Sequence, residues 1–352
     1  MSVLEPPPAA LNGELTAYFE ARAADVDAGT ASVRDSIAFV ARRVLFDPER
    51  ADLETTVGLI ATIARSDLSS AFSLWAHRMA IEYLETLPSS APLRARVLPR
   101  LLAGEVLGST ALAGATAHHL SGAPLPLAFE RDGDAIVVNG RLPWASNLWP
   151  EFVSVTAAAD ATDPRRRLIV AFAHDTPGVD VDPYPPLLAL QATGSSSISF
   201  RGARIGPEWV VSEDLDGFVR RILPAFLLLQ SAFCVGLASR ALEEAGGAMG
   251  GQRDVLRGDV QALKSRLDDA EVQLRTATRK SDRTAIPLRD LLALRLEVAG
   301  VAAEAVHVEL KAAGGRGYLR ASGTARRLRE AAFLPVQAPT EVQLRWALSR
   351  FA

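Results

Sequence analysis

The apolar positions in the first hundred residues follow a helical spacing. Four large side chains recur three and four residues apart: Phe72, Trp75, Met79 and Tyr83. This spacing places them on one face of a helix. A similar spacing continues to Gly104, a residue type favoured just after a helix end. The stretch 87–90, Leu-Pro-Ser-Ser, predicts a break between two helices. The pattern therefore predicts a helical region over about 11–104.

Between about residues 108 and 213 the pattern changes to that of strands. Asp132-Gly133 stands between two extended runs and is a strong signal for a β-hairpin. Further strands are expected at four segments: 152–156, 168–172, 198–200 and 209–211. Together these segments predict a small antiparallel sheet or barrel.

From residue 215 onward the helical pattern returns. Seven apolar residues alternate four and three apart: Leu256, Val260, Leu263, Leu267, Ala270, Leu274 and Ala277. This heptad pattern predicts a long helix that packs nearly antiparallel in a bundle. A coiled coil between two chains would give the same pattern, but the helical sequence that follows favours the bundle. We divide the chain into an N-terminal helical domain (1–106), a middle β domain (107–213) and a C-terminal helical bundle (214–352).

Composition and charge narrow the class of protein. The 352 residues are 49% hydrophobic and 22% charged, which is typical of a globular protein. A net charge of −3 gives no support for binding nucleic acid or an anionic membrane. The single cysteine, Cys234, excludes an internal disulfide and a cysteine-based metal cluster, and we expect no metal site. Pro224 interrupts the apolar run 222–237, which favours a core helix over a membrane span. We expect a cytoplasmic protein, because the first residues lack the pattern of a signal peptide.

Several motifs follow one another in an order that matches a known family. They are Ala-Arg-Ser-Asp-Leu-Ser-Ser-Ala-Phe at 64–72, the segment 98–110, the hairpin 132–146 ending in Trp-Ala-Ser, and Gly-Gly-Arg-Gly at 314–317 followed by Arg326, Arg329 and Thr340. Each fragment alone is weak evidence, but their order and spacing resemble the acyl-CoA dehydrogenase superfamily of flavoproteins over nearly the whole chain. The resemblance implies a mainly α fold: an N-terminal helical domain, a middle antiparallel β-barrel or sheet, and a C-terminal four-helix bundle.

The resemblance also implies a cofactor, FAD, and residues that would hold it. Trp144 would stack near the flavin ring, and the Ser146 hydroxyl and backbone amides near Thr110 and Trp144 would face its polar edge. Three glycines would let the backbone approach the pyrophosphate: Gly314, Gly315 and Gly317. A sheet aromatic, a strand-end hydroxyl and a helix-ending turn are the structural alternatives for these positions. The resemblance further implies a homodimer or homotetramer and a small-molecule substrate, by family default a CoA thioester.

The chain departs from the family where the catalytic carboxylate belongs. An ungapped alignment places Ala338 at the usual base position, and a shift by one residue places Gln337 there. Phe226 occupies the alternative base position on the first helix of the bundle. None of these side chains can remove a proton, which disfavours ordinary acyl-CoA dehydrogenation. The diphosphate motifs are also eroded at 110–117 and 250–254, so the flavin could be FMN, weakly bound FAD, or absent.

Histidines and arginines offer further candidates. His77 resembles a histidine of the superfamily's reduced-flavin monooxygenases, where it would work with Ser146 on a C4a-hydroperoxide; the structural alternative is a helix residue bonded to a carbonyl. His118 and His119 could line the same site, and the run 165–167, Arg-Arg-Arg, could meet a CoA phosphate; solvated loops are the alternative for both. Three functions remain: a flavin-dependent dehydrogenase with a relocated base, a monooxygenase, or a degenerate non-redox member that keeps the fold for binding or assembly.

Overall fold

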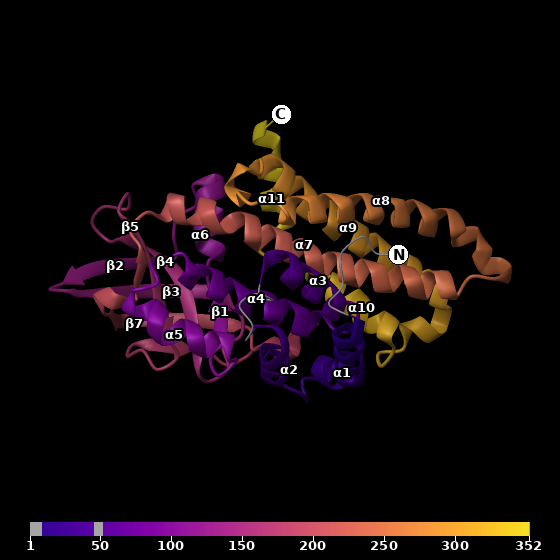
Figure 1. The fold of residues 1–352 in the computed structure, drawn as a ribbon, viewed down its shortest axis with the longest axis horizontal. Helices are drawn as coiled ribbons and strands as arrows, with labels where there is room; N and C mark the ends of the chain where they lie inside the picture. The colour runs from indigo at the N-terminus through magenta and orange to yellow at the C-terminus, as the bar shows by residue number, and fades with distance from the viewer. Residues whose placement is uncertain (1–8, 46–51, 352) are drawn as a thin grey trace.

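The computed structural model describes residues 9–45 and 52–351 and opens with the helices that the sequence predicts. Figure 1 shows these N-terminal helices packed beside the sheet and against the long C-terminal helices. They are α1 (Ala9–Ala28), α2 (Val33–Val40), α3 (Leu53–Ala64), α4 (Leu68–Glu85) and α5 (Pro92–Leu102). Gly104 has a φ of +68° just beyond α5, as expected for a residue that ends a helix. The predicted break at 87–90 lies between α4 and α5.

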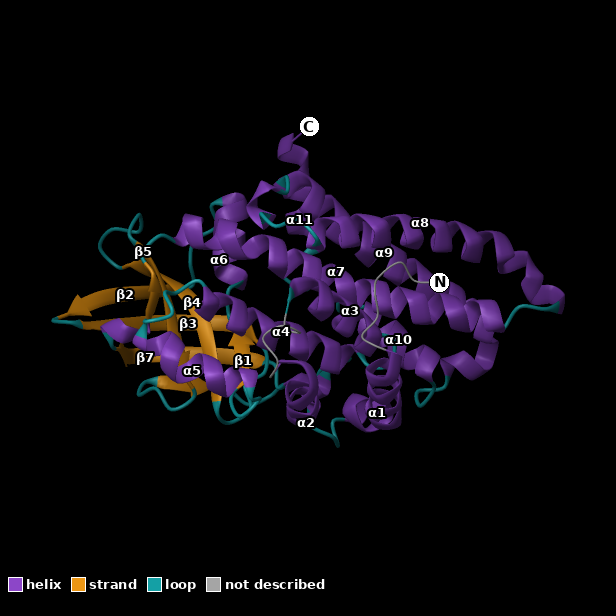
Figure 2. Ribbon diagram, viewed as in Figure 1, coloured by secondary structure: helices purple, strands orange, loops and turns teal. Residues whose placement is uncertain are grey.

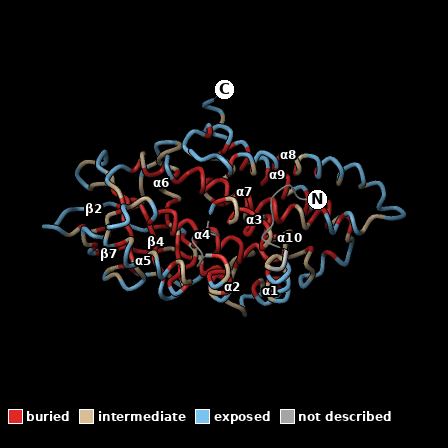
Figure 3. The backbone as a smooth tube through the Cα atoms, in the orientation of Figure 1, coloured by how far each residue is buried: buried red, intermediate tan, exposed pale blue. Residues whose placement is uncertain are grey.

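Helix α4 is the centre of the molecule and differs from a one-sided amphipathic helix. Asp67 begins it by accepting hydrogen bonds from the backbone N–H groups of Ser69 and Ser70. Every residue from Leu68 to Leu84 is buried, and Figure 3 shows α4 enclosed by the rest of the chain. The apolar spacing predicts burial of one face of this helix, and tertiary packing buries the other faces as well.

The strands form one eight-stranded sheet at one end of the molecule (Figure 2). The path through it is β6-β7-β3-β2-β4-β5-β8, and β1 pairs with β4 off this path. The predicted all-antiparallel arrangement is wrong, because β1 and β2 both run parallel to β4 and the sheet is mixed. The strands are β1 (Leu107–Thr110), β2 (Leu127–Asp132), β3 (Ala135–Ala145), β4 (Phe152–Asp160), β5 (Arg167–Ala173), β6 (Val179–Val181), β7 (Ser196–Ile205) and β8 (Val210–Ser212), and α6 (Ala113–Ser121) follows β1.

The predicted hairpin is confirmed. Asp132 pairs with Ala135 across a two-residue turn, and Gly133 takes a φ of +59° there. A turn with positive φ matches the right-handed twist of the two strands and favours glycine.

Long helices build the C-terminal part, as the heptad pattern predicts. Helix α8 buries its heptad residues from Leu263 to Ala277 between α7 and α9. In the described part of this region, three α-helices are long and two are short. The region is therefore a helical domain of three long and two short helices, where a four-helix bundle was expected. They are α7 (Leu215–Gly247), α8 (Arg257–Thr278), α9 (Leu288–Ala313), α10 (Gly323–Ala331) and α11 (Glu341–Leu348). Helix α7 is long and apolar enough to cross a membrane, but 94% of its most apolar stretch is buried inside the protein.

Two large apolar cores hold these parts together, and a third, small cluster joins Val26, Val33 and Ala192. The larger core joins the N-terminal helices, α7 to α11 and one face of the sheet. The smaller core fills the other side of the sheet, around Phe129, Phe152 and Phe172. The three regions predicted from the sequence therefore share one large core.

Candidate active site

A cavity of about 670 Å³ opens where the sheet meets α4, α7 and the segment after α10. Its volume lies within the usual range for small-molecule and cofactor sites, about 300–1,000 Å³. Its wall is mainly apolar, with a few hydroxyl and amide groups. The lining includes Phe72, Trp75, Thr110, Trp144, Ser146, Leu188, Ser195, Phe226, Arg329, Phe333, Gln337, Ala338 and Gln343.

The sheet side of the cavity carries an aromatic ring and a chain of hydroxyl groups. Trp144, near the end of β3, is 55% exposed and forms part of the lining. The Ser146 hydroxyl lies 2.8 Å from that of Ser195, which lies 2.7 Å from that of Thr193. These two hydrogen bonds hold Ser146 in place in the cavity wall. The sequence reading missed Ser195, since a serine after Gly194 is unremarkable until β7 is placed beside β3.

Asn147 braces the end of this strand against the helices. Its side chain is fully buried and donates to the carbonyl groups of Ser73 in α4, at 2.8 Å, and Gly108 in β1, at 2.9 Å. Its φ of +61° is a left-handed conformation that asparagine tolerates better than most residues. Because Asn147 follows Ser146 directly, it fixes the hydroxyl relative to α4.

Thr110 closes the cavity at the end of β1. The hydroxyl groups of Tyr83 and Thr110 lie 2.8 Å apart. Burial raises the pKa of Tyr83, so its hydroxyl stays neutral and remains a hydrogen-bonding group. Thr110, at the end of β1, therefore lines the same cavity as Ser146, which follows β3.

His77 points away from this site. Its Nδ1 accepts the Gly108 N–H at 2.9 Å, and its Nε2 lies 2.9 Å from the Leu101 carbonyl, to which it donates. The ring is completely buried and is not part of the cavity lining. Its pairing with Ser146 in a monooxygenase does not fit this geometry, because both nitrogen atoms would first have to leave backbone partners. Burial lowers the pKa of His77 to about 4, which keeps the ring neutral.

All three candidate base positions line the cavity. Phe226, Gln337 and Ala338 form one part of its wall, and Trp75 Nε1 donates to the Phe226 carbonyl at 3.2 Å. No aspartate or glutamate is among the described lining residues. The positions that the resemblance assigns to a base therefore line the cavity and carry an amide and apolar groups.

A buried arginine lies behind Gln337. Arg295, in α9, donates to the side-chain oxygen of Gln337 at 3.0 Å and to that of Gln230 at 3.2 Å. Gln230 in turn donates to the Ala338 carbonyl at 2.9 Å. These contacts fix the segment that forms the cavity wall. The sequence reading missed Arg295, although it lies four residues after Leu291 and three before Val298, both buried on the same face of α9.

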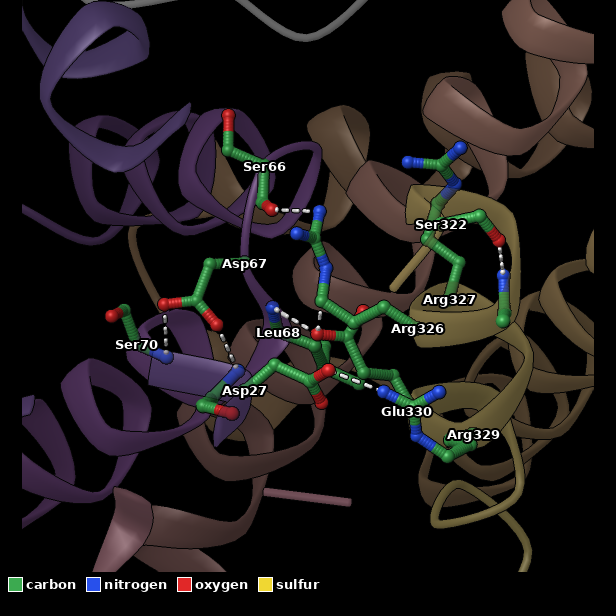
Figure 4. A network of polar contacts seen from close by, with 12 residues as sticks. Asp27, Ser66, Asp67, Leu68, Ser70, Ser322, Arg326, Arg327, Arg329 and Glu330 are labelled. Carbon is green, nitrogen blue, oxygen red and sulfur yellow. Dashed lines mark hydrogen bonds and ion pairs between the residues drawn. The ribbon is translucent and has the colours of Figure 1, made fainter. Parts of the chain in front are cut away.

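Arg329 stands at the rim of the cavity and is held by an ion pair with Asp27 of α1. Figure 4 shows this pair beside a second group of polar residues, in which Glu330 lies near Arg326 and the start of α4. Arg326 Nε is 3.6 Å from Glu330, whose carboxyl accepts the Leu68 N–H at 3.3 Å. Arg329, the cation at the rim, is therefore already paired with Asp27.

The remaining candidates lie elsewhere. Gly314, Gly315 and Gly317 belong to the short 3₁₀ turn η6 (Gly314–Tyr318) at the end of α9, outside the cavity lining. His118 and His119 are in α6, where His118 contacts the Ala123 carbonyl and Arg167, and His119 contacts Asp216. Arg165 and Arg166 pair with Asp163, as in a charged turn. No group of three or more metal-binding side chains occurs in the described chain.

Comparisons with solved structures identify the architecture. A glutaryl-coenzyme A dehydrogenase in complex with glutaryl-CoA superposes with a TM-score of 0.83 at 16% identity, over 97% of this chain and 93% of that one. The chain has the acyl-CoA dehydrogenase fold. The butyryl-CoA dehydrogenase from Megasphaera elsdenii matches this acyl-CoA dehydrogenase-like protein with a TM-score of 0.84 at 14% identity, over 97% of this chain and 96% of that one. No family model and no curated protein matches the sequence.

A third solved structure broadens the comparison. KijD3, in complex with FMN and dTDP-3-amino-2,3,6-trideoxy-4-keto-3-methyl-D-glucose, matches with a TM-score of 0.81 at 19% identity, over 99% of this chain and 95% of that one. At identities this low the likeness concerns the fold. Proteins of the same fold thus include one bound to glutaryl-CoA and one bound to FMN and a dTDP-sugar.

The cavity of this acyl-CoA dehydrogenase-like chain suits the ring of a flavin better than its phosphates. Trp144 supplies an aromatic surface to the wall, and Ser146 and Thr110 are residues of the wall that carry hydroxyl groups. Arg329 is the one cation among the described lining residues, and Asp27 already neutralises it. The ring therefore fits, while the lining holds no free cation for a phosphate group.

Proposed function

We propose that the chain is a flavin-dependent oxidoreductase whose small-molecule substrate shares the cavity with the flavin ring. The observation that carries this proposal is the convergence of Thr110, Trp144 and Ser146 on one cavity of about 670 Å³. A bound flavin would accept the electrons of the oxidation. Trp144 would cover the ring, Ser146 and Thr110 would orient its polar edge, and the apolar wall would exclude water.

The cavity favours chemistry that needs no carboxylate base. Gln337, Ala338 and Phe226 occupy the candidate base positions and cannot abstract a proton at neutral pH. His77 is held by Gly108 and Leu101 and offers no substitute. The substrate would therefore arrive already activated, or lose its proton to another group.

Flavin titration tests the proposal. The purified protein should show flavin absorbance or bind added FAD or FMN, and Trp144→Ala should weaken that binding about fivefold or more, because an aromatic stacking contact contributes about 1 kcal/mol or more. Trp346→Ala is the matched control, since Trp346 is a half-exposed tryptophan on α11 outside the cavity lining. A colourless protein that binds neither flavin would contradict the proposal.

A non-redox binding protein is the second candidate. The pairing of Arg329 with Asp27 favours it, because the lining then offers no free cation for the cofactor phosphates. The same titration separates the two functions. We also expect a homodimer or homotetramer, which stays a prediction that light scattering of the purified protein can check.

A further inference from the structure

The guanidinium of Arg295 is buried and has no ionic partner among the residues that the structure describes. It is 0% exposed and donates to three neutral oxygens: Gln230 Oε1 at 3.2 Å, Gln337 Oε1 at 3.0 Å and Leu334 O at 3.4 Å. Its Nη1 has no hydrogen-bond partner, and among the described residues Arg295 forms no ion pair. The ring of Phe233, 6.0 Å from the guanidinium carbon, is its one cation–π contact among the described residues.

Other buried arginines of the chain show what a paired site requires. Arg327 is bound by Glu309, and Arg78 lies 3.1 Å from Glu82. A buried charge without a counterion is costly, and arginine cannot relieve the cost by losing its proton. Arg295 thus differs from the other buried arginines in the described part of the chain, and it lies directly behind the cavity wall.

Gln337 lies between this charge and the cavity. Its side-chain oxygen faces Arg295, because the reverse orientation would set its amide N–H groups against the guanidinium donors. The amide nitrogen is consequently the free end, and it is buried without a partner. Gln337 is 4% exposed and belongs to the cavity lining. Gln337, a residue of the wall, therefore carries an enclosed and unpaired donor that is backed by a positive charge.

We infer that Gln337 and Arg295 form a binding site for the anionic oxygen of a small, mainly apolar organic acid. The amide N–H of Gln337 would donate to the anion, and the anion would supply the negative charge that Arg295 lacks among the described residues. No carboxylate of the described lining would repel the anion, and the apolar wall suits an aliphatic or aromatic remainder. That this acid is the substrate rests on the proposed oxidoreductase function; the binding site itself does not.

The test compares octanoate with the neutral 1-octanol by calorimetric titration of the full chain, first without flavin and then with added FAD. Octanoate should bind at least about tenfold more tightly than 1-octanol, since a hydrogen bond to a charged group contributes about 1.5–3 kcal/mol. Arg295→Met should remove this preference and leave 1-octanol binding unchanged. Arg345→Met, which alters an exposed arginine of α11, should keep the preference.

Gln337→Glu gives the complementary variant. Its carboxylate would pair with Arg295 and occupy the anion's place, so octanoate binding should fall to the level of 1-octanol while the midpoint of thermal unfolding stays the same or rises. If Arg295→Met does not fold, Gln337→Leu replaces it, with loss of the preference as the expected result. Equal binding of octanoate and 1-octanol by the unmodified protein, or an unchanged preference in Arg295→Met, would overturn the inference. A protein that prefers octanoate but binds no flavin would refute the oxidoreductase function and leave the anion site standing.

Discussion

The backbone N–H of Gly108 donates a 2.9 Å hydrogen bond to Nδ1 of His77, while the carbonyl of Gly108 accepts one from Asn147. Both polar groups of one strand residue are thus taken by side chains, one from α4 and one from the end of β3. Because Nε2 of His77 donates to Leu101, the ring is held as a single neutral tautomer. This arrangement ties β1, α4, α5 and β3 together beneath the cavity.

His77 should make the protein sensitive to acid. Its pKa is about 4 in the folded protein and 6.5 in the unfolded chain, so the unfolded state binds the proton first. The free energy of unfolding should hold above pH 6.5 and fall as the pH drops from 6.5 toward 4, by roughly 3 kcal/mol in all. Urea unfolding at several pH values measures this loss.

His77→Gln is the variant for this prediction. It should be less stable at pH 7 but lose less of its stability between pH 6.5 and 4.5. His307→Gln changes a histidine on the exposed side of α9 and should follow the unmodified protein. An identical acid profile in His77→Gln would exclude His77 as the cause.

Glu330 should act in the opposite direction. Burial raises the pKa of Glu330 to about 7, while Arg326 lowers it and Asp67 raises it further. The folded protein therefore keeps a proton that the unfolded chain releases near pH 4.5. Stability from this group is present below pH 4.5 and is lost as the pH rises to about 7, by roughly 3 kcal/mol.

Glu330→Gln should remove this fall, because an amide has the shape of the protonated acid and no charge to lose. The measurement is the urea midpoint between pH 4.5 and 7.5, after the acid loss due to His77 is removed in a His77→Gln background. Glu243→Gln, on the exposed side of α7, is the control. A fall of unchanged size in the Glu330→Gln protein would show that another group titrates.

Gly108→Ala should destabilise the protein by disturbing the close contact between β1 and α4. A methyl group at this position would lie 2.6 Å from Cβ of Ala80 and 2.8 Å from the backbone oxygen of His77. Backbone cannot move aside as a flexible side chain can, so we expect a loss of about 1–3 kcal/mol in unfolding free energy. Gly300→Ala is the matched control in α9, where an added methyl group meets no atom within 4 Å. It should raise stability by about 0.5–1 kcal/mol, because alanine favours the helix; equal effects of the two changes would refute the close contact.

Two variants of Asn147 separate the free-energy cost of its left-handed backbone conformation from the contribution of its side-chain hydrogen bonds. Asn147→Gly and Asn147→Ala both lose the bonds to Ser73 and Gly108. At a φ of +61° only alanine adds a steric cost. The free energy of unfolding of Asn147→Ala should therefore be about 1–2 kcal/mol lower than that of Asn147→Gly. Thermal unfolding of both variants checks the difference, and a more stable alanine variant would contradict the left-handed conformation.

Local patterns predicted the parts of the fold that depend on neighbours in sequence. The hairpin at Gly133 and the heptad helix α8 follow from turn chemistry and periodicity. The parallel pairing of β1 and β2 with β4 does not, because it joins strands from distant segments and no local signal encodes their direction. The burial of α4 on all sides depends in the same way on neighbours supplied by tertiary packing.

The candidate site was predicted unevenly for a similar reason. Motif order singled out Thr110, Trp144 and Ser146 as cofactor-binding residues, and the structure places them on one cavity together with Phe226, Gln337 and Ala338; their roles stay predictions. It could not give the rotation of α4, which turns His77 toward β1. A charged residue in a leucine-rich helix suggests a solvent-facing position, so Arg295 was missed, although its spacing from Leu291 and Val298 marked it as buried.

The large core described above, shared by helices and sheet, makes the chain one cooperative unit. A fragment of residues 107–213 would expose the face of β4 and β5 that packs on the helices, around Val155, Ile169 and Ala171. The helices without that segment would lose the wall that carries Trp144 and Ser146 and would expose α4 to water. Neither piece holds a complete cavity, so any ligand that the cavity binds stabilises all three regions at once and protects distant helices from proteolysis together with the sheet.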